Sequence, residues 1–317
     1  SAAREQAMEI GRDMWPEWDL KLMTPEELVR SYELDNSGDA NKDDVKRAND
    51  WRSSVMQYQA AYNRMTPGER AAWDKAYAPR IAEYRRIKDT LSHDELVRWK
   101  YQQYMKDYCA VIKGLDENVG RLLKYLEETG ELDNTIIVYT SDQGFFLGEH
   151  GWFDKRFMYE ECQRTPLLVR YPKAVAAGAH TKALAMNIDL APTFVDMAGL
   201  PVPADMQGRS LRGVLTSGGT VPEGWRTGVY YHYYEYPSWH SVKRHYGVRT
   251  ADYKLIHFYN DVDEWELYDL KKDPHEMCNV YNDPEYAAVR SDMHARLEQL
   301  QQECRDTDPC EKESEFF

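Results

Sequence analysis

The sequence has few cysteines, no long apolar run and a shortage of positive charge. Its five cysteines among 317 residues show no C-x-x-C spacing, which excludes the common zinc-ribbon and thioredoxin-type motifs. No stretch approaches the ~18 consecutive apolar residues of a membrane-spanning helix, so no membrane insertion is expected. Lys and Arg number 40 against 54 Asp and Glu, a net charge of −14. That balance argues against a nucleic-acid partner, although a local cationic cluster can still bind a small anionic substrate.

The residues that are present predict a folded chain that begins with helices. Residues 1–92 are polar and helical in pattern, with Thr24 and Thr66 each placed to cap a helix and each followed by Pro and Glu. Ser92 and Glu95 form a further capping box. The helix that they start carries an apolar stripe at a spacing of about 3.6 residues and ends at Gly130. We expect this stripe to be buried core; it consists of Val97, Tyr101, Tyr104, Tyr108, Ile112, Leu115, Val119, Leu122 and Leu126.

Two kinds of sheet follow. Thr135–Thr140 is a short β-branched run after a long helix, which predicts a buried parallel strand, and residues 166–171 predict a second strand. Alternation of helix and strand favours an α/β layered fold. From about residue 225 the pattern changes to short aromatic strands separated by turns, which predicts a small antiparallel sheet with a closing helix over 284–300. We therefore divide the chain into 1–220 and 221–317.

The segment after the first strand carries candidate metal ligands. Asp142 and Gln143 stand at the carboxyl end of that strand, the edge at which open α/β sheets bind ligands, and Gly144 allows a sharp turn there. Oxygen donors of this kind suit a hard cation, Ca²⁺ or Mg²⁺. The alternative is that this S-D-x-G sequence forms an ordinary turn.

A glycine- and cation-rich stretch follows at once. Lys155 is a candidate for neutralising a bound sulfate or phosphate, and its alternative is a surface lysine. His150 is a candidate acid, base or orienting donor, with a structural histidine as the alternative. Further along, an aromatic stretch over 230–240 suits sugar rings, and its loop end places His240 and His245 as candidate substrate contacts.

Together these residues resemble a known family. Thr140-Ser-Asp-Gln-Gly-Phe-Phe-Leu-Gly-Glu-His-Gly-Trp-Phe-Asp-Lys, then Arg164-Thr-Pro-Leu-Leu-Val-Arg-Tyr-Pro, resembles the second half of a type I sulfatase in the alkaline-phosphatase superfamily. Tyr246-Gly-Val-Arg-Thr-Ala-Asp-Tyr-Lys-Leu-Ile resembles the C-terminal subdomain of that family. The resemblance runs from about residue 92 to 300. Within the family, the sequence is similar to bacterial N-acetylglucosamine-6-sulfatases and iduronate-2-sulfatases.

The resemblance implies a fold and an activity. The fold is part of a mostly parallel sheet flanked by helices, plus a small C-terminal α+β subdomain with an antiparallel sheet. The activity is hydrolysis of sulfate esters of a glycosaminoglycan-type carbohydrate, in a secreted or periplasmic protein. Asp142 and Gln143 would bind the divalent cation, usually Ca²⁺, although many relatives have Asn or His at the second position. Lys155 would contact the sulfate group.

One element of the family is not found in this sequence. The nucleophile of sulfatases is a formylglycine made from Cys or Ser in C/S-x-P-x-R, and no such motif occurs here. Asp142 and Gln143 also supply fewer oxygens than the six to eight that Ca²⁺ prefers. We therefore expect the chain to be the C-terminal part of a longer enzyme, with the N-terminal part of that enzyme as its partner. The alternatives are a phosphodiester or phosphonate monoester hydrolase of the same superfamily, and a non-catalytic remnant that acts as a binding partner.

Overall fold

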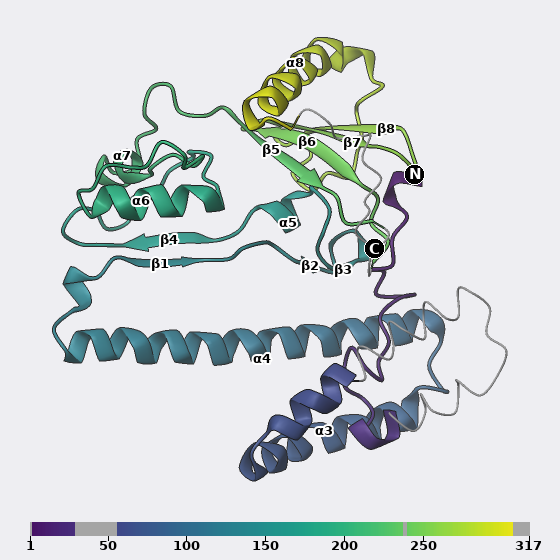
Figure 1. Ribbon diagram of the computed structural model, residues 1–317. Coiled ribbons are helices and arrows are strands. Elements are labelled where there is room, and N and C mark those ends of the chain that lie inside the picture. The colour runs from purple at the N-terminus through teal and green to yellow at the C-terminus, as the bar shows by residue number, and fades with distance from the viewer. Residues whose placement is uncertain (1, 29–55, 237–239, 307–317) are drawn as a thin grey trace. The chain divides into compact units, whose positions relative to one another are not determined.

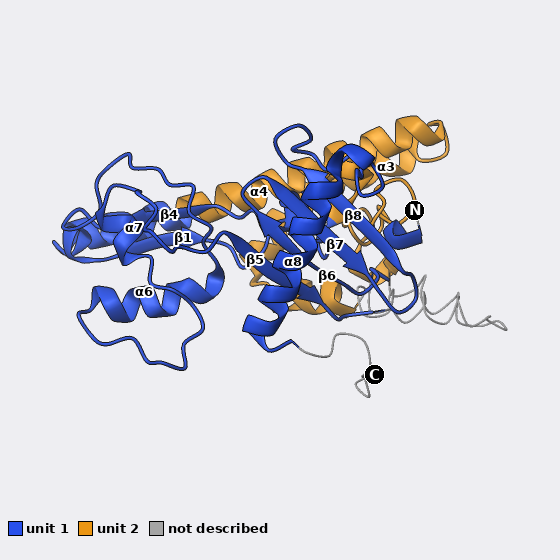
Figure 2. Cartoon of the chain, turned by 90° about the horizontal axis from the view of Figure 1, so that it is seen from above, with its two compact units in different colours: residues 1–6, 118–146, 154–317 blue, residues 7–117, 147–153 orange. Residues whose placement is uncertain are grey.

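The computed structural model describes residues 2–28, 56–236 and 240–306, and the rest of the chain, including part of the predicted helical segment 1–92, lies outside the described residues. Two compact units are present. The first unit comprises residues 1–6, 118–146 and 154–317, and the second comprises residues 7–117 and 147–153 (Figure 2). The predicted division at residue 220 stays a prediction.

The second unit contains one whole helix and residues 93–117 of another, whose residues 118–128 belong to the first unit, and the starts of both helices follow from the sequence. Helix α3 (Pro67–Ile87) begins at Thr66, whose hydroxyl accepts a hydrogen bond from the amide of Glu69 while the Glu69 carboxylate accepts from the amide of Thr66. Helix α4 (His93–Glu128) begins with the same reciprocal pair at Ser92 and Glu95. Both capping boxes confirm the sequence prediction. None of the described helices is long and apolar enough to cross a membrane.

Helix α4 confirms the predicted stripe in its first half only. Val97, Tyr101 and Tyr104 pack against a buried cluster made by Ile10, Met14, Leu20, Leu22 and Tyr84. In the second half no residue of the stripe is buried, and the prediction of buried core is wrong there: Ile112, Leu115 and Leu122 expose 49%, 47% and 58% of their surface, and Val119 and Leu126 are half-buried. An amphipathic pattern shows that a helix has an apolar face, but it does not show that the described residues cover that face.

The first unit contains a two-stranded sheet formed by β1 (Ile137–Thr140) and β4 (Leu167–Arg170) (Figure 1). The predicted strands are present, but their pairing within the described residues is antiparallel, with Val138 opposite Val169, so the predicted parallel neighbour is not found there. Nor is β1 buried as predicted, since Tyr139 is 38% exposed. The same unit contains several short helical elements, namely η2 (Leu132–Asn134), α5 (Glu160–Gln163), η4 (Asn187–Asp189), α6 (Leu190–Met197) and α7 (Arg212–Thr216).

The predicted antiparallel sheet and closing helix are confirmed. Strands β5 (Gly228–Tyr233), β6 (His245–Thr250), β7 (Tyr253–Phe258) and β8 (Glu264–Asp269) pair in chain order, and α8 (Ala287–Cys304) follows the short turn η5 (Pro284–Tyr286). Figure 1 shows α8 beside this sheet. The side chains of α8 meet one face of the sheet in a core that includes Val248, Leu255, Leu267, Met293 and Leu297.

The other face of the sheet receives the segment that follows Lys155. Phe157, Met158 and Tyr159 are fully buried. Phe157 lies with its ring centre 6.2 Å from that of Phe258, and the Tyr159 hydroxyl donates to Glu266 at 2.7 Å. Because side chains alternate between the two faces of a strand, the sheet packs α8 on one side and this segment on the other.

A buried ion cluster ties the same segment to the sheet. Lys254 is fully buried, with its ammonium nitrogen 3.0 Å from Glu160 and 2.7 Å from the equally buried Glu276. Glu160 also accepts from the guanidinium of Arg249. Buried charges persist only where they are paired, so Lys254 fixes the start of α5 against β7.

Candidate active site

The loop after β1 carries the predicted metal ligands, and local hydrogen bonds fix its backbone conformation. The Ser141 hydroxyl donates to the carbonyl oxygen of Gln143 at 2.7 Å, and Asn187 donates from its side chain to the carbonyl oxygen of Asp142 at 2.9 Å. The Asp142 side chain is exposed, and its carboxylate lies 3.3 Å from the Ser141 hydroxyl. The turn therefore presents the Asp142 carboxylate outward while its backbone is tied down.

Gly144 explains why the loop takes this course. Its amide donates to the carbonyl oxygen of Cys162 at 2.7 Å, and the next amide, of Phe145, donates to the carbonyl oxygen of Glu161 at 2.8 Å. A Cβ atom at position 144 would lie 2.8 Å from the carbonyl carbon of Glu161, closer than real Cβ contacts. Only glycine lets the backbone approach α5 this closely.

The residues around Asp142 fit a hard cation in part. Asp142 and Gln143 offer the carboxylate and amide oxygens that Ca²⁺ and Mg²⁺ prefer. Among the residues that the structure describes, no group of three or more His, Cys, Asp or Glu is arranged to hold a metal ion. Six to eight oxygens surround a typical Ca²⁺ ion, so this loop supplies only a fraction of such a set.

Lys155 lies beside the same loop. Its ammonium nitrogen is 5.9 Å from the centre of the Phe145 ring, and Phe145 is two residues beyond Gln143. The side chain is 32% exposed, and its nitrogen is 3.4 Å from the carboxylate of Asp154. The loop is joined to α5 by backbone hydrogen bonds, and Lys155 contacts the Phe145 ring of the same loop. The Lys155 ammonium therefore lies close to the predicted metal-binding loop.

Asp154 is the centre of a charged cluster that sequence reasoning missed. One carboxylate oxygen lies 2.7 Å from Nε2 of His240, and the other lies 3.0 Å from the guanidinium of Arg156. Burial opposes ionisation of Asp154, but the hydrogen bond from His240 and the charge of Arg156 outweigh it and lower the pKa of the carboxyl to about 2. The only signal in the sequence was the run Asp154-Lys-Arg itself, which places a carboxylate beside two cations.

The two histidines predicted to contact substrate have different surroundings. His240 is only 6% exposed and is engaged by Asp154. His245 has no exposed surface and is the first residue of β6, where the rings of Phe157, Tyr233 and Phe258 surround it. Burial lowers the pKa of His245 to about 4, so its ring is neutral at pH 7. This placement favours a packing role for His245 over contact with a ligand.

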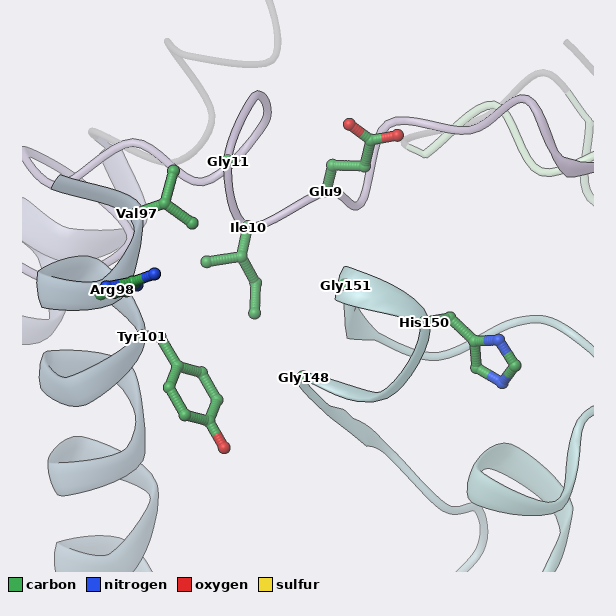
Figure 3. A pocket seen from close by; sticks show the side chains of 9 residues that line it. All are labelled: Glu9, Ile10, Gly11, Val97, Arg98, Tyr101, Gly148, His150 and Gly151. Carbon is green, nitrogen blue, oxygen red and sulfur yellow. The ribbon is translucent and has the colours of Figure 1, made fainter. Parts of the chain in front are cut away.

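His150 belongs to the second unit. It adopts a left-handed backbone conformation with φ of 56° in the turn η3 (Glu149–Gly151), and its ring stacks on Trp152. The turn borders a pocket of about 400 Å³ that Glu9, Arg98 and Tyr101 also line. Figure 3 shows the His150 ring directed away from Tyr101, on the outer side of the turn.

Comparison with known proteins gives the family. The chain matches the family described as "Sulfatase" over residues 57–200 and the family described as "N-sulphoglucosamine sulphohydrolase, C-terminal" over residues 148–303. Together the two sulfatase matches span residues 57–303, which is more than half of the chain, so the chain belongs to the sulfatases.

Individual relatives show more specific similarities than the family matches do. An N-acetylglucosamine-6-O-sulfatase of Bacteroides thetaiotaomicron is 55% identical over 316 residues, which is 100% of this chain and 52% of that protein. A protein solved in complex with its substrate D-glucosamine-2-N,6-O-disulfate matches with a TM-score of 0.84 and 55% identity, over 97% of this chain and 57% of its own. A phosphonate monoester hydrolase from Silicibacter pomeroyi matches with a TM-score of 0.56 and 28% identity, over 64% of this chain and 42% of its own. The chain thus spans about half the length of these relatives.

Proposed function

We propose that the chain is part of a sulfuric ester hydrolase that removes sulfate from a sulfated glucosamine unit of a glycosaminoglycan-type saccharide. The observation that carries this proposal is the position of Lys155 beside the Asp142–Phe145 loop. A cation and oxygen donors suited to a metal ion thereby share one region, as binding of a charged ester requires. The substrate class is taken from the names of the two relatives that are 55% identical.

In this proposal Asp142 and Gln143 hold a divalent cation. Ca²⁺ is the preferred assignment, and Mg²⁺ is the alternative. Such an ion, when bound, neutralises charge on the sulfate oxygens. The ammonium of Lys155 stabilises negative charge on the ester oxygen as the bond to sulfur breaks. His150 serves as acid, base or orienting donor. His240 and His245 are not retained as saccharide contacts in this proposal, because both side chains are buried. The nucleophile, a formylglycine, is proposed to come from outside this chain.

We also propose that the remaining part of the enzyme covers apolar surface that the described residues leave exposed. On α4 this surface includes Val111 at 72% and Tyr125 at 59% exposure, and on β4 it includes Leu168. Soluble monomers seldom expose apolar side chains in continuous rows, so each row is a candidate contact for further polypeptide. The relatives possess about as much additional sequence as this chain contains.

Assays of the complete gene product test the function. We expect release of sulfate from glucosamine 6-O-sulfate, measured by ion chromatography, and a fall in kcat of roughly 10²- to 10³-fold for Lys155→Ala, because transition-state charge loses its partner. Lys271→Ala is the matched control, since Lys271 is also ion-paired to an aspartate but is 70% exposed. Unchanged turnover of Lys155→Ala contradicts the assignment.

A second candidate is hydrolysis of phosphonate monoesters, which the Silicibacter pomeroyi relative favours. Aryl sulfate and aryl phosphonate esters, assayed side by side with the same preparation, separate the two. Greater kcat/KM for the phosphonate ester would replace the proposed function with this one.

A further inference from the structure

Lys155 lies between two residues whose backbones are held in an unfavourable conformation. Asp154 has a φ of 71° and Arg156 a φ of 114°, and neither is glycine. L-residues rarely adopt positive φ, and such strain persists only where the surroundings overdetermine it. Two strained residues on either side of one lysine indicate that the position of that lysine is fixed by its neighbours.

The side chain of Asp154 supplies the first restraint. The carboxylate bridges His240 at 2.7 Å and Arg156 at 3.0 Å, and its exposure is only 18%. An ionised carboxylate can only accept hydrogen bonds, so Nε2 of His240 is the donor. His240 is itself buried, which gives the pair little freedom to reorient.

The sheet supplies the second restraint. The carbonyl oxygen of Arg156 accepts a hydrogen bond from the Tyr231 hydroxyl at 3.4 Å, and the next residue, Phe157, is fully buried against Phe258. The backbone is therefore anchored on the far side of Lys155 as well. The backbone is thus held before Lys155 by the contact between Asp154 and His240, and after Lys155 by the β5–β8 sheet.

We propose that Asp154 and His240 are positioning residues that hold Lys155 in its working orientation. This inference rests on the proposed role of Lys155 in sulfate ester hydrolysis. The Oδ1 atom of Asp154 also lies 3.4 Å from the ammonium of Lys155 and 3.0 Å from the guanidinium of Arg156, so its negative charge offsets the repulsion between these two cations. His240 thereby influences the rate through Asp154, and not by contact with the sugar.

A double-mutant cycle on the complete gene product tests the proposal. We expect Asp154→Asn to lower kcat about 10- to 100-fold with KM changed less than about threefold, because a displaced catalytic group loses rate and not substrate affinity. In a Lys155→Ala background the same substitution should lower kcat less than about twofold, since no lysine remains to be positioned. The proposal is overturned if the effects of Asp154→Asn and Lys155→Ala on kcat multiply in the double variant, or if Asp154→Asn changes KM alone.

Substitution of His240 provides the second arm, which also decides the case if Asp154→Asn does not fold. We expect His240→Ala to lower kcat as Asp154→Asn does, and His240→Gln, whose side-chain amide can donate to the same carboxylate, to restore most of it. Equal loss in both variants, or a rise in KM alone, overturns the proposal.

The matched control is Asp263→Asn. Asp263 accepts a hydrogen bond from His257 at 2.8 Å and is 88% exposed, so its loss should leave kcat unchanged. Absence of sulfate release by the unaltered protein refutes the proposed function itself, and wild-type turnover of Lys155→Ala refutes the role of Lys155. An impaired Lys155→Ala variant with multiplicative effects of Asp154→Asn refutes the positioning role alone.

Discussion

Replacement of Gly144 by alanine should separate the position of the loop from its chemistry. A Cβ atom there would lie 2.8 Å and 2.9 Å from the carbonyl carbons of Glu161 and Cys162, and it would overlap the Glu161 carbonyl oxygen outright. Carbon atoms in contact are normally about 3.5–4.0 Å apart, so the backbone must move by roughly 1 Å. The movement strains or breaks the hydrogen bonds that the amides of Gly144 and Phe145 make with α5.

Both stability and rate should respond. Overpacking of this kind costs about 1–3 kcal/mol of unfolding free energy. A displacement of about 1 Å near reacting groups costs on the order of 10²-fold in kcat. Thermal unfolding followed by circular dichroism and turnover of glucosamine 6-O-sulfate measure the two effects on the complete gene product.

The control for this prediction is Gly68→Ala. The added Cβ of Gly68 meets nothing within 4 Å, and the residue lies in the first turn of α3. We expect neutral or slightly raised stability there, because alanine favours helices over glycine. If Gly144→Ala retains the melting temperature and kcat of the unaltered protein, the close approach of the loop to α5 is wrong.

Three further predictions concern other parts of the molecule. Lys254→Met should cost about 3–5 kcal/mol in denaturant unfolding, because Glu276 is left buried without its cation. Burial already raises the pKa of Glu276, and protonation of this carboxyl removes the unpaired charge. The stability loss of Lys254→Met should therefore grow as the pH rises above the pKa that Glu276 has in the unfolded chain, and it should become smaller as the pH falls toward that value. A stability loss that does not depend on pH contradicts this account. Chelation by EGTA should abolish sulfate release and added Ca²⁺ should restore it, with Asp142→Asn requiring more Ca²⁺, and full activity in EGTA would exclude Ca²⁺ as the bound cation. Ser92→Ala should lower the melting temperature by an amount equivalent to about 1 kcal/mol, through loss of the α4 cap, and no change would show that the cap adds nothing.

Local sequence signals predicted the elements better than their partners. The capping boxes at Thr66 and Ser92 depend on residues three apart, so the sequence contains everything needed to place them. Strand pairing in β1 depends on residues about 30 positions away. The apolar run at 135–140 therefore predicted a strand, but not the antiparallel partner that the structure gives it.

For the site, the sequence indicated the charged residues and not the way they are held. Asp142 and Lys155 stood out by type and spacing, and the structure brings Lys155 to the loop that Asp142 begins. Positive φ at Asp154 and Arg156 left no trace in the sequence, because neither residue is a glycine. The sequence prediction placed His245 in the loop before a strand, whereas β6 begins at His245 itself.

Every residue of strands β5–β8 is buried or half-buried, because both faces of the sheet are covered. Random diversification of these strands should therefore yield few folded clones. The exposed Tyr234 and Glu235, just beyond β5, offer a margin where substitutions cost little folding free energy. Diversification confined to this margin should yield more folded clones than diversification of the strands.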